Sequence, residues 1–175
     1  MQSGSDRILK VMRRPYKNEK FIEICEKMKA ARPGLAITTD IIVGFPGETE
    51  EDFQATIDTV ERLQFDNAFV FRYSKRRNTP AAEMDGQLDE SVKEERNQRL
   101  LAVVDRLAIA SNAAVVGTRQ QVLCEGPSKN NAARLTGRTP QNKIVIFDGD
   151  PARLTGQILD IRIEHSTGFT VFGTL

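Results

Sequence analysis

The sequence predicts an α/β chain in two parts: an incomplete parallel barrel or sheet over residues 1–116, then a small five-stranded antiparallel OB-like β-barrel over residues 117–175. In the first part, two short apolar runs alternate with helical segments, which is typical of repeated βα units and a parallel sheet. Only two such strands are present, so we expect a piece of a larger structure. Beyond Gly117 the hydrophobic period changes from 3.6 to 2, which indicates short, half-buried strands.

Composition excludes several classes of protein. The chain has 175 residues, of which 39% are hydrophobic, as in a soluble globular protein. No apolar run approaches the roughly 20 residues of a membrane helix, and no signal peptide is recognisable, so we expect a cytoplasmic protein without membrane contact. The formal charge of +1 gives no overall basic signature. Cys25 and Cys124 lie in apolar patterns and are interpreted as buried hydrophobes. A metal site is not expected, because the chain has no CxxC pair and only one histidine, His165.

The chain begins with two predicted helices. Ser5 or Asp6 can cap the first, which ends by Pro15. Asn18 can cap the second, which stops at residues 32–34. Apolar residues of the second helix follow helical spacing and are expected to share one buried face: Phe21, Ile24, Cys25 and Met28.

A buried strand and a glycine turn follow these helices. The β-branched run at residues 41–43 favours a parallel strand that is covered on both faces. Gly44 and Gly47 bracket Pro46, so the chain turns sharply and its backbone can approach a ligand closely. Thr49 fits the N-cap of the next helix, with Asp52 in the capping-box position. Because ligands bind at the carboxyl ends of parallel strands, this turn is a candidate binding site. The alternative is an ordinary βα turn whose glycines serve geometry alone.

A second apolar strand at residues 68–71 is followed by a cationic loop, residues 72–80. Its cations favour contact with a phosphate or an anionic substrate, and the alternative is a solvated loop. A long helix is predicted from Asp89 to about Val115. Its apolar face carries Leu100, Val103, Val104, Leu107, Ala110 and Ala114. Its outer face carries Glu94, Glu95, Arg96 and Arg99.

Strict alternation predicts the strands of the second part. It is clearest at residues 122–124, 143–147, 159–163 and 169–172. Turn signals lie at residues 126–128, 136–137, 148–151 and 167–168. Small barrels of this kind often bind single-stranded nucleic acid or looped RNA. Four cations fall in or beside the loops, although a solvated surface explains them equally well: Lys129, Arg134, Arg138 and Lys143.

Several motifs occur in a fixed order along the whole chain. They are residues 2–6, then Met12, Arg14 and Tyr16, residues 40–49, residues 73–74, Arg76, residues 79–82, residues 125–129, residues 137–139 and residues 142–143. In this order they resemble the methylthiotransferase family of radical S-adenosylmethionine (SAM) enzymes. The motif at residues 40–49 is the most specific of them.

The resemblance implies a partial TIM-like radical-SAM barrel in residues 1–116 and a TRAM domain in residues 117–175. The cofactors implied for the full-length protein are SAM and two [4Fe-4S] clusters. Neither cysteine of this chain belongs to a cluster motif. We therefore expect no metal ligand and no catalytic residue in this chain, and no activity of the chain alone.

The residues at 126–129 favour the tRNA branch of the family. That branch adds a methylthio group to C2 of an isopentenylated adenosine next to the anticodon, so the implied partner is the tRNA anticodon arm, bound by a monomer. Two alternatives remain open. One is a stand-alone, non-catalytic RNA-binding module, and the other is a protein-modifying relative.

The resemblance also implies roles for individual residues. Contacts with SAM are expected from Gln2, Ser3, Ser5, Arg14, Ile42, Gly44, Phe45 and Pro46. Contacts with the RNA substrate are expected from Arg76, Lys129, Arg134, Arg138 and Lys143. Arg13 and Arg77 stand at positions that vary in the family, so the resemblance assigns no role to either.

Overall fold

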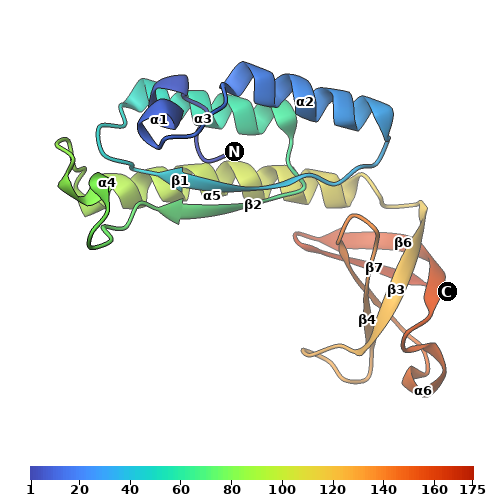
Figure 1. Cartoon of the computed structure of the whole chain (residues 1–175). Coiled ribbons are helices and arrows are strands. Elements are labelled where there is room, and N and C mark those ends of the chain that lie inside the picture. The colour runs from blue at the N-terminus through green and yellow to red at the C-terminus, as the bar shows by residue number, and fades with distance from the viewer. The chain divides into compact units, whose positions relative to one another are not determined.

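A computed structural model describes residues 1–175, and the chain divides into two compact units. Unit 1 is Met1–Leu107 and unit 2 is Ala108–Leu175. Each is described by itself (Figure 1). The division lies inside the long helix, nine residues before the expected boundary at residues 116 and 117, since the last turns of that helix group with unit 2.

Unit 1 alternates helices and strands as the sequence predicts. Its elements are α1 (Asp6–Val11), α2 (Asn18–Ala31), β1 (Thr38–Val43), α3 (Glu50–Leu63), β2 (Asn67–Arg72), α4 (Pro80–Glu83) and the greater part of α5 (Glu90–Ala113). β1 and β2 pair in parallel, with Thr38 opposite Asn67 and Val43 opposite Arg72. The parallel α/β character is confirmed. The sheet has only these two strands, so the wider barrel stays a prediction.

The expectation that β1 is covered on both faces is wrong. Burial alternates along the strand, so that Ile41 and Val43 are buried while Ile42 is only partly covered. On β2, Phe69 and Phe71 are 54% and 53% exposed. Helices α2, α3 and α5 pack on the face that carries Ile41 and Val43, whereas Ile42 on the other face packs with residues of α1 and α4 near the end of the strand.

The buried face of the sheet shares one core with α2, α3 and α5. From α3 this core contains Phe53, and from α5 it contains Leu100. On α2 the inward residues are Ile22 and Cys25, whereas Ile24 and Met28, which were expected to face inward, are 46% and 45% exposed. The burial of Cys25 confirms its interpretation as a small hydrophobe, and burial raises the pKa of its thiol.

The start of α3 confirms the predicted cap. The Thr49 hydroxyl accepts from the Asp52 N–H, and the Asp52 carboxylate accepts from the Thr49 N–H, which completes a capping box. In α5, however, Arg96 does not face solvent as expected: its side chain is only 6% exposed. A partner on another element, which helical spacing alone does not reveal, accounts for this burial.

Unit 2 contains a closed five-stranded barrel. Its strands are β3 (Arg119–Pro127), β4 (Leu135–Arg138), β5 (Ile144–Phe147), β6 (Ile158–Thr167) and β7 (Thr170–Thr174), with the short helix α6 (Pro151–Leu154) before β6. The order around the barrel is β3-β4-β5-β7-β6. Four of the pairings are antiparallel, but β5 and β7 pair in parallel, which corrects the expectation of a wholly antiparallel barrel. The barrel closes by placing its last strand beside β5.

One predicted turn is a strand. Thr136 and Gly137 lie within β4, which pairs with both β3 and β5. A Cβ atom on Gly137 would lie 2.5 Å from the Leu123 carbonyl oxygen and 2.5 Å from Val122 Cγ1. This glycine therefore permits the close approach of β4 to β3. The barrel interior is filled by apolar side chains: Val122, Cys124, Leu135, Val145, Phe147, Ile161, Ile163 and Val171.

Two further properties concern the whole chain. None of its helices is both long and apolar enough to cross a membrane. The structure brings no three His, Cys, Asp or Glu side chains together in a group that could hold a metal ion.

Candidate functional site

The turn that follows β1 is held by its own backbone and by a glutamate. Gly44 adopts a φ of +70°, and a Cβ atom there would lie 2.5 Å from Lys93 Cγ. The Gly44 N–H donates to Glu48 Oε1 at 2.9 Å, and the Glu48 N–H donates to the Phe45 carbonyl at 2.9 Å. Glycine is thus required at position 44 by conformation and by space together.

A buried ion pair fastens this turn to α5. Arg96 donates to Glu48 Oε1 at 2.7 Å, and the two side chains are only 6% and 1% exposed. Burial raises the pKa of Glu48, although the Gly44 N–H and the Arg96 guanidinium oppose that rise. Arg96 also donates to the Glu48 carbonyl at 3.1 Å. The pair fixes the position of the turn relative to α5.

Aromatic side chains form the wall behind the turn. The rings of Phe45 and Tyr73 meet edge to face with their centroids 5.2 Å apart, and Ile8 of α1 packs with them. The Tyr73 hydroxyl is buried without a hydrogen-bond partner. Lys93 Nζ lies 5.4 Å from the centre of the Tyr73 ring. A buried hydroxyl without a partner is an uncommon feature and marks a place where a further polar group could bind.

A cavity of about 240 Å³ opens at this strand end, and we call it the strand-end cavity. Its lining is mostly apolar and consists of Val11, Met12, Arg13, Arg14, Ile42, Phe45, Thr79, Pro80, Ala81 and Met84. It unites three predicted cofactor residues, Arg14, Ile42 and Phe45. Gly44 and Pro46 are buried nearby in the turn but do not line it.

The three remaining predicted cofactor residues make contacts within the chain. Ser3 is fully buried, and its hydroxyl accepts from the Ser5 N–H at 3.1 Å. Ser5 caps α1 and donates from its hydroxyl to Asp52 Oδ1 at 2.6 Å. Gln2 accepts from the Tyr16 hydroxyl at 3.0 Å. Their hydroxyl and amide groups therefore hold the start of the chain in place.

Asp52 is the centre of this contact network. Burial acts to raise the pKa of this carboxyl group, but hydrogen bonds from Arg7, Ser5 and Thr49 together lower it well below its usual range. Arg7 also forms an ion pair with Asp52. One carboxylate thus joins the first turn of α1 to the first turn of α3.

Arg76 is the predicted RNA contact in unit 1. It is exposed in the loop between β2 and α4, where its carbonyl accepts from the Thr79 hydroxyl at 2.8 Å. It is not among the residues that line the strand-end cavity. Its neighbour Thr79 does line that cavity, so Arg76 borders the lining without being part of it.

In unit 2, a groove of about 500 Å³ crosses the barrel surface, and we call it the barrel groove. Its lining is Glu125, Ser128, Lys129, Asn130, Asn131, Arg134, Thr136, Arg138, Ile144, Ile146, Thr170 and Phe172. Three of the four predicted barrel cations thus share one groove. The fourth, Lys143, instead donates to Ser111 Oγ at 2.7 Å and Asn112 Oδ1 at 3.1 Å on the last turns of α5.

The groove cations are oriented by neighbouring polar groups. Arg134 Nε lies 2.8 Å from Asp148 Oδ1, and Arg138 donates to Asn142 Oδ1 at 2.9 Å. Lys129 is exposed and makes no ion pair. The arginines are therefore partly preorganised, whereas the lysine is free to follow a ligand.

Sequence analysis missed an aromatic feature of this groove. The rings of His165 and Phe172 stack in parallel with centroids 4.6 Å apart, and Arg134 lies over the Phe172 ring at 5.6 Å. Phe172 is half-buried and lines the barrel groove, whereas His165 is exposed and is not part of the lining. Aromatic rings beside cations can stack on unpaired bases. From the sequence, His165 is interpreted only with respect to metal binding. The alternation at residues 169–172 already carried a signal, because Phe172 occupies a position off the barrel interior.

The two segments match different protein families. Residues 1–60 match the Radical SAM superfamily, and residues 113–175 match the TRAM domain. Two proteins named tRNA-2-methylthio-N(6)-dimethylallyladenosine synthase are similar to the chain throughout. That of Akkermansia muciniphila is 66% identical over 99% of this chain, and that of Fusobacterium nucleatum subsp. nucleatum is 49% identical over all of it. The chain spans only 38% and 40% of the lengths of these relatives.

Proposed function

The chain carries a radical SAM superfamily segment followed by a TRAM domain, and we propose that it forms part of a tRNA methylthiotransferase. In this proposal the whole protein adds a methylthio group to C2 of an isopentenylated adenosine next to the anticodon. The observation that carries the proposal is the 66% identity to the A. muciniphila synthase over 99% of the chain. This identity extends through both units, so it covers the strand-end cavity and the barrel groove together.

Within this function, unit 1 provides one wall of the SAM site. Bound SAM supplies the carbon radical of the reaction when an iron–sulfur cluster reduces it. The strand-end cavity fits part of such a ligand, because Ile42 and Phe45 are apolar and the cationic Arg14 stands at its edge. Its volume of about 240 Å³ lies below the usual range for a complete ligand pocket, about 300–1,000 Å³, so further walls are needed.

The residues of this chain do not fit an iron–sulfur cluster. Cys25 and Cys124 are buried in the separate cores of the two units, and thiolate ligation needs several cysteines around one cluster. We therefore place the clusters of the full-length enzyme, two in the family pattern, on residues outside this chain. The role of unit 1 is to bind and orient the cofactor. Its turn is kept rigid by the Glu48–Arg96 pair.

Unit 2 holds the tRNA anticodon arm. Lys129, Arg134 and Arg138 contact phosphates, which positions the RNA without reading its sequence. The stacked pair of Phe172 and His165 offers a platform for an unpaired base. Arg76 lies at a strand end and contacts RNA near the modified base. We further propose that the full enzyme works as a monomer in the cytoplasm, where tRNA is modified.

A chimera tests this proposal. The matching segment of the A. muciniphila synthase is replaced by this chain, and the chimera is expressed in cells that lack their own methylthiotransferase. Mass spectrometry of digested tRNA then measures the methylthio product. We expect the product to appear. A chimera that is folded and binds its clusters but leaves tRNA unmodified contradicts the proposal. A chimera that also carries Lys129→Gln and Arg138→Gln lacks two cations of the barrel groove and serves for comparison. We expect it to modify less tRNA than the unsubstituted chimera.

A further inference from the structure

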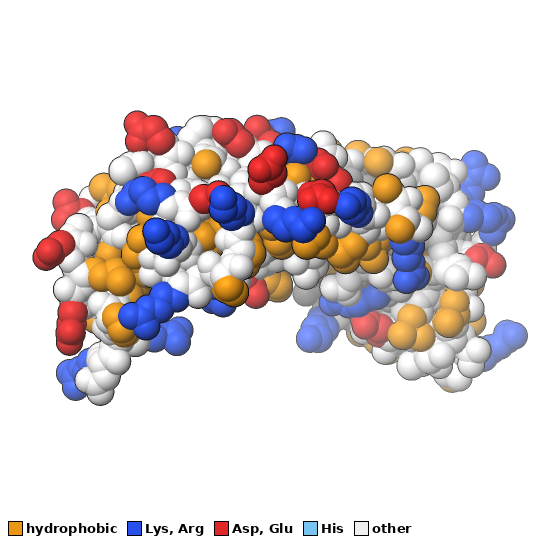
Figure 2. Space-filling model, turned by 45° about the horizontal axis from the view of Figure 1, so that its top comes forward, with side chains coloured by type: hydrophobic (Ala, Val, Ile, Leu, Met, Phe, Trp, Pro, Cys, Tyr) orange, Lys and Arg blue, Asp and Glu red, His pale blue; other side chains and the backbone are white.

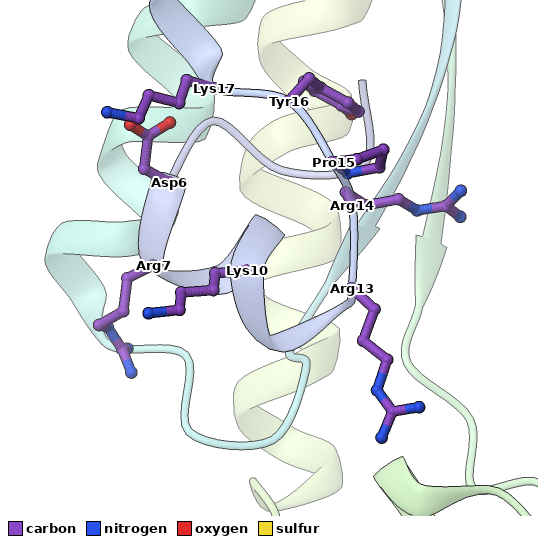
Figure 3. Close-up of a pocket in the computed structure, with 8 residues that line it drawn as sticks. All are labelled: Asp6, Arg7, Lys10, Arg13, Arg14, Pro15, Tyr16 and Lys17. Atoms are coloured by element: carbon purple, nitrogen blue, oxygen red, sulfur yellow. The ribbon is translucent and has the colours of Figure 1, made fainter.

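A second basic groove lies beside α1, in unit 1, far along the sequence from the barrel. This α1 groove has a volume of about 700 Å³. Its lining is Asp6, Arg7, Lys10, Arg13, Arg14, Pro15, Tyr16 and Lys17 (Figure 3). Five of these eight residues are cations and one is an acid. Basic and acidic side chains are interspersed over the helical face of the molecule shown in Figure 2, so this local excess of one sign is distinctive.

The acidic groups near the α1 groove are already engaged. Asp6 accepts from the Asn18 N–H at 2.7 Å, and Asp52 forms an ion pair with Arg7. By contrast, Lys10, Arg13 and Lys17 are exposed and make no ion pair or side-chain hydrogen bond. Asp6 offsets one of the five positive charges of the lining and Asp52 offsets that of Arg7, so the α1 groove keeps a net positive charge.

The backbone holds Arg13 in a conformation that suits glycine better. Its φ is +57°, in the left-handed region. The Arg13 N–H donates to the Lys10 carbonyl at 3.0 Å, and the Arg14 N–H donates to the Leu9 carbonyl at 2.8 Å. These two bonds form the Schellman end of α1, in which this position is usually glycine. Arg13 is the one cation among the four non-glycine residues with positive φ, and this turn directs its side chain away from the end of α1 (Figure 3).

The directions of the side chains indicate the shape of the ligand. In Figure 3, Arg7 and Lys10 extend from one side of α1, Arg13 extends from the turn below it, and Lys17 lies at the opposite end of the groove. The cations are spread along the α1 groove and do not converge on one point. This arrangement suits a chain of phosphates better than a single small anion.

We propose that the α1 groove binds the phosphate backbone of an RNA strand, as a second RNA-contacting surface separate from the barrel groove. This inference rests on the proposed function, because the RNA concerned is the tRNA substrate. Lys10, Arg13 and Lys17 carry the contact, and Arg7 supports it from its pair with Asp52. Such contacts position the RNA and do not select its sequence.

The test compares charge-neutralised chains. The groove variant is Lys10→Gln, Arg13→Gln and Lys17→Gln in the full chain. Its control is Lys20→Gln, Lys27→Gln and Arg32→Gln, which removes the same charge from exposed positions on α2 and its end. Fluorescence anisotropy measures the affinity for an anticodon stem-loop RNA between about 50 and 200 mM salt, where phosphate contacts respond strongly. We expect the salt slope of the groove variant to fall by about 2, for three lost contacts. The control keeps the slope of the parent chain.

A second variant separates charge from structure. Arg13→Gly relieves the left-handed strain, so we expect a higher midpoint of thermal unfolding together with weaker RNA binding. Arg13→Lys keeps the charge and is expected to bind RNA like the parent chain. If Arg13→Gly leaves RNA affinity unchanged, its charge has no role in binding and the inference is wrong.

The outcomes distinguish this inference from the proposed function. A groove variant that binds RNA like the parent chain, while Lys129→Gln with Arg138→Gln weakens binding, overturns the inference alone. If the parent chain binds no RNA, the proposed function is contradicted, and tripolyphosphate is titrated while the amide resonances of residues 6–17 are followed. Shifts that vanish in the groove variant then support a polyphosphate site, and unshifted resonances overturn it.

Discussion

Asp52 shows how much of the fold of unit 1 depends on one side chain. It closes the capping box of α3 and also accepts from Ser5, the N-cap of α1. Its side chain is only 10% exposed, so these hydrogen bonds are largely shielded from water. The spacing of Thr49 and Asp52 predicted the first role. The second joins residues 47 positions apart, and no local pattern reports such a contact.

Asp52→Asn is expected to destabilise unit 1 by about 2 kcal/mol at neutral pH, because hydrogen bonds to a charged acceptor contribute about 1.5–3 kcal/mol. The folded pKa of Asp52 is lowered. Its stabilisation is therefore complete above the unfolded pKa of about 3.9 and is lost as the pH falls below that value. Urea unfolding at several pH values measures the difference in the free energy of unfolding between the two chains. Amide hydrogen exchange in α3 measures the same difference locally.

Asp58→Asn is the control for this substitution, because Asp58 lies on the same helix with an exposed hydrogen bond to Gln54. It should change stability by less than about 0.5 kcal/mol. A difference between Asp52→Asn and the parent chain that stays constant down to the most acidic pH at which the chain folds would show that the charge of Asp52 is not responsible.

Ser3 and Ser5 illustrate what a motif can and cannot predict. The motif at residues 2–6 indicated a cofactor contact, and that remains a prediction. The structure shows instead that Ser3 lies against Thr56 and that Gly4 donates to the Thr56 hydroxyl at 2.9 Å. Motif residues can thus be required for packing beside a site, and only the folded contacts separate that role from ligand binding.

At the scale of elements, helical spacing did not predict every buried residue of α5, because burial also depends on the residues that face the helix. Leu100 and Val104 are buried as predicted. Arg96 is buried as well, because Glu48 from the turn after β1 meets it there. Removing one partner of such a pair leaves the other charge buried and uncompensated, which is more costly than the pair is stabilising.

The barrel strands were predicted well except at β4. Alternation identified β5, β6 and β7, but the dipeptide Thr136-Gly137 carried a turn signal. In the structure, Gly137 is needed by the strand crossing, because the Leu123 carbonyl and the Val122 side chain occupy the space of a Cβ atom. A glycine that permits close packing and a glycine that permits a turn are identical in a single sequence.

Gly137→Ala is expected to destabilise the barrel by about 2–3 kcal/mol, since the added methyl group meets backbone atoms that cannot move aside easily. Gly168→Ala is its control. A Cβ atom at Gly168 meets open space, so only its φ of +61° opposes alanine, at about 1 kcal/mol. Hydrogen exchange of the barrel amides measures the loss of stability in each of the two variants. Equal losses for the two substitutions would contradict the close-packing argument.

At the scale of the whole molecule, the sequence predicted a two-part chain and its order of elements. It did not predict that one face of the β1–β2 sheet, with Phe69 and Phe71, is exposed. The reason is physical. Apolar strands indicate a buried environment, but the covering element need not lie in the same stretch of chain. The relatives are much longer than this chain, which spans 38% of the A. muciniphila synthase.

The candidate sites were predictable where their residues lie close together in the sequence. Residues within one motif, such as Ile42 and Phe45, do meet in the strand-end cavity. Cations from one barrel face, Lys129, Arg134 and Arg138, do share a groove. The α1 groove escaped prediction because its charge arises from a helix and the turn after it, and Arg13 has no distinguishing sequence context.

We propose that unit 2 binds RNA through the cations of the barrel groove. The most direct test is the salt dependence of the affinity of the whole chain for an anticodon stem-loop. The barrel-groove variant for this test is Lys129→Gln, Arg134→Gln and Arg138→Gln. The control is Arg119→Gln, Arg153→Gln and Arg162→Gln, which removes three exposed cations of the same unit outside the barrel groove.

We expect strongly salt-dependent binding by the parent chain. We also expect a slope that falls by about 2 in the barrel-groove variant and stays unchanged in the control. Equal slopes in the two variants, or a parent chain that binds no RNA in low salt, would contradict RNA binding through the barrel groove.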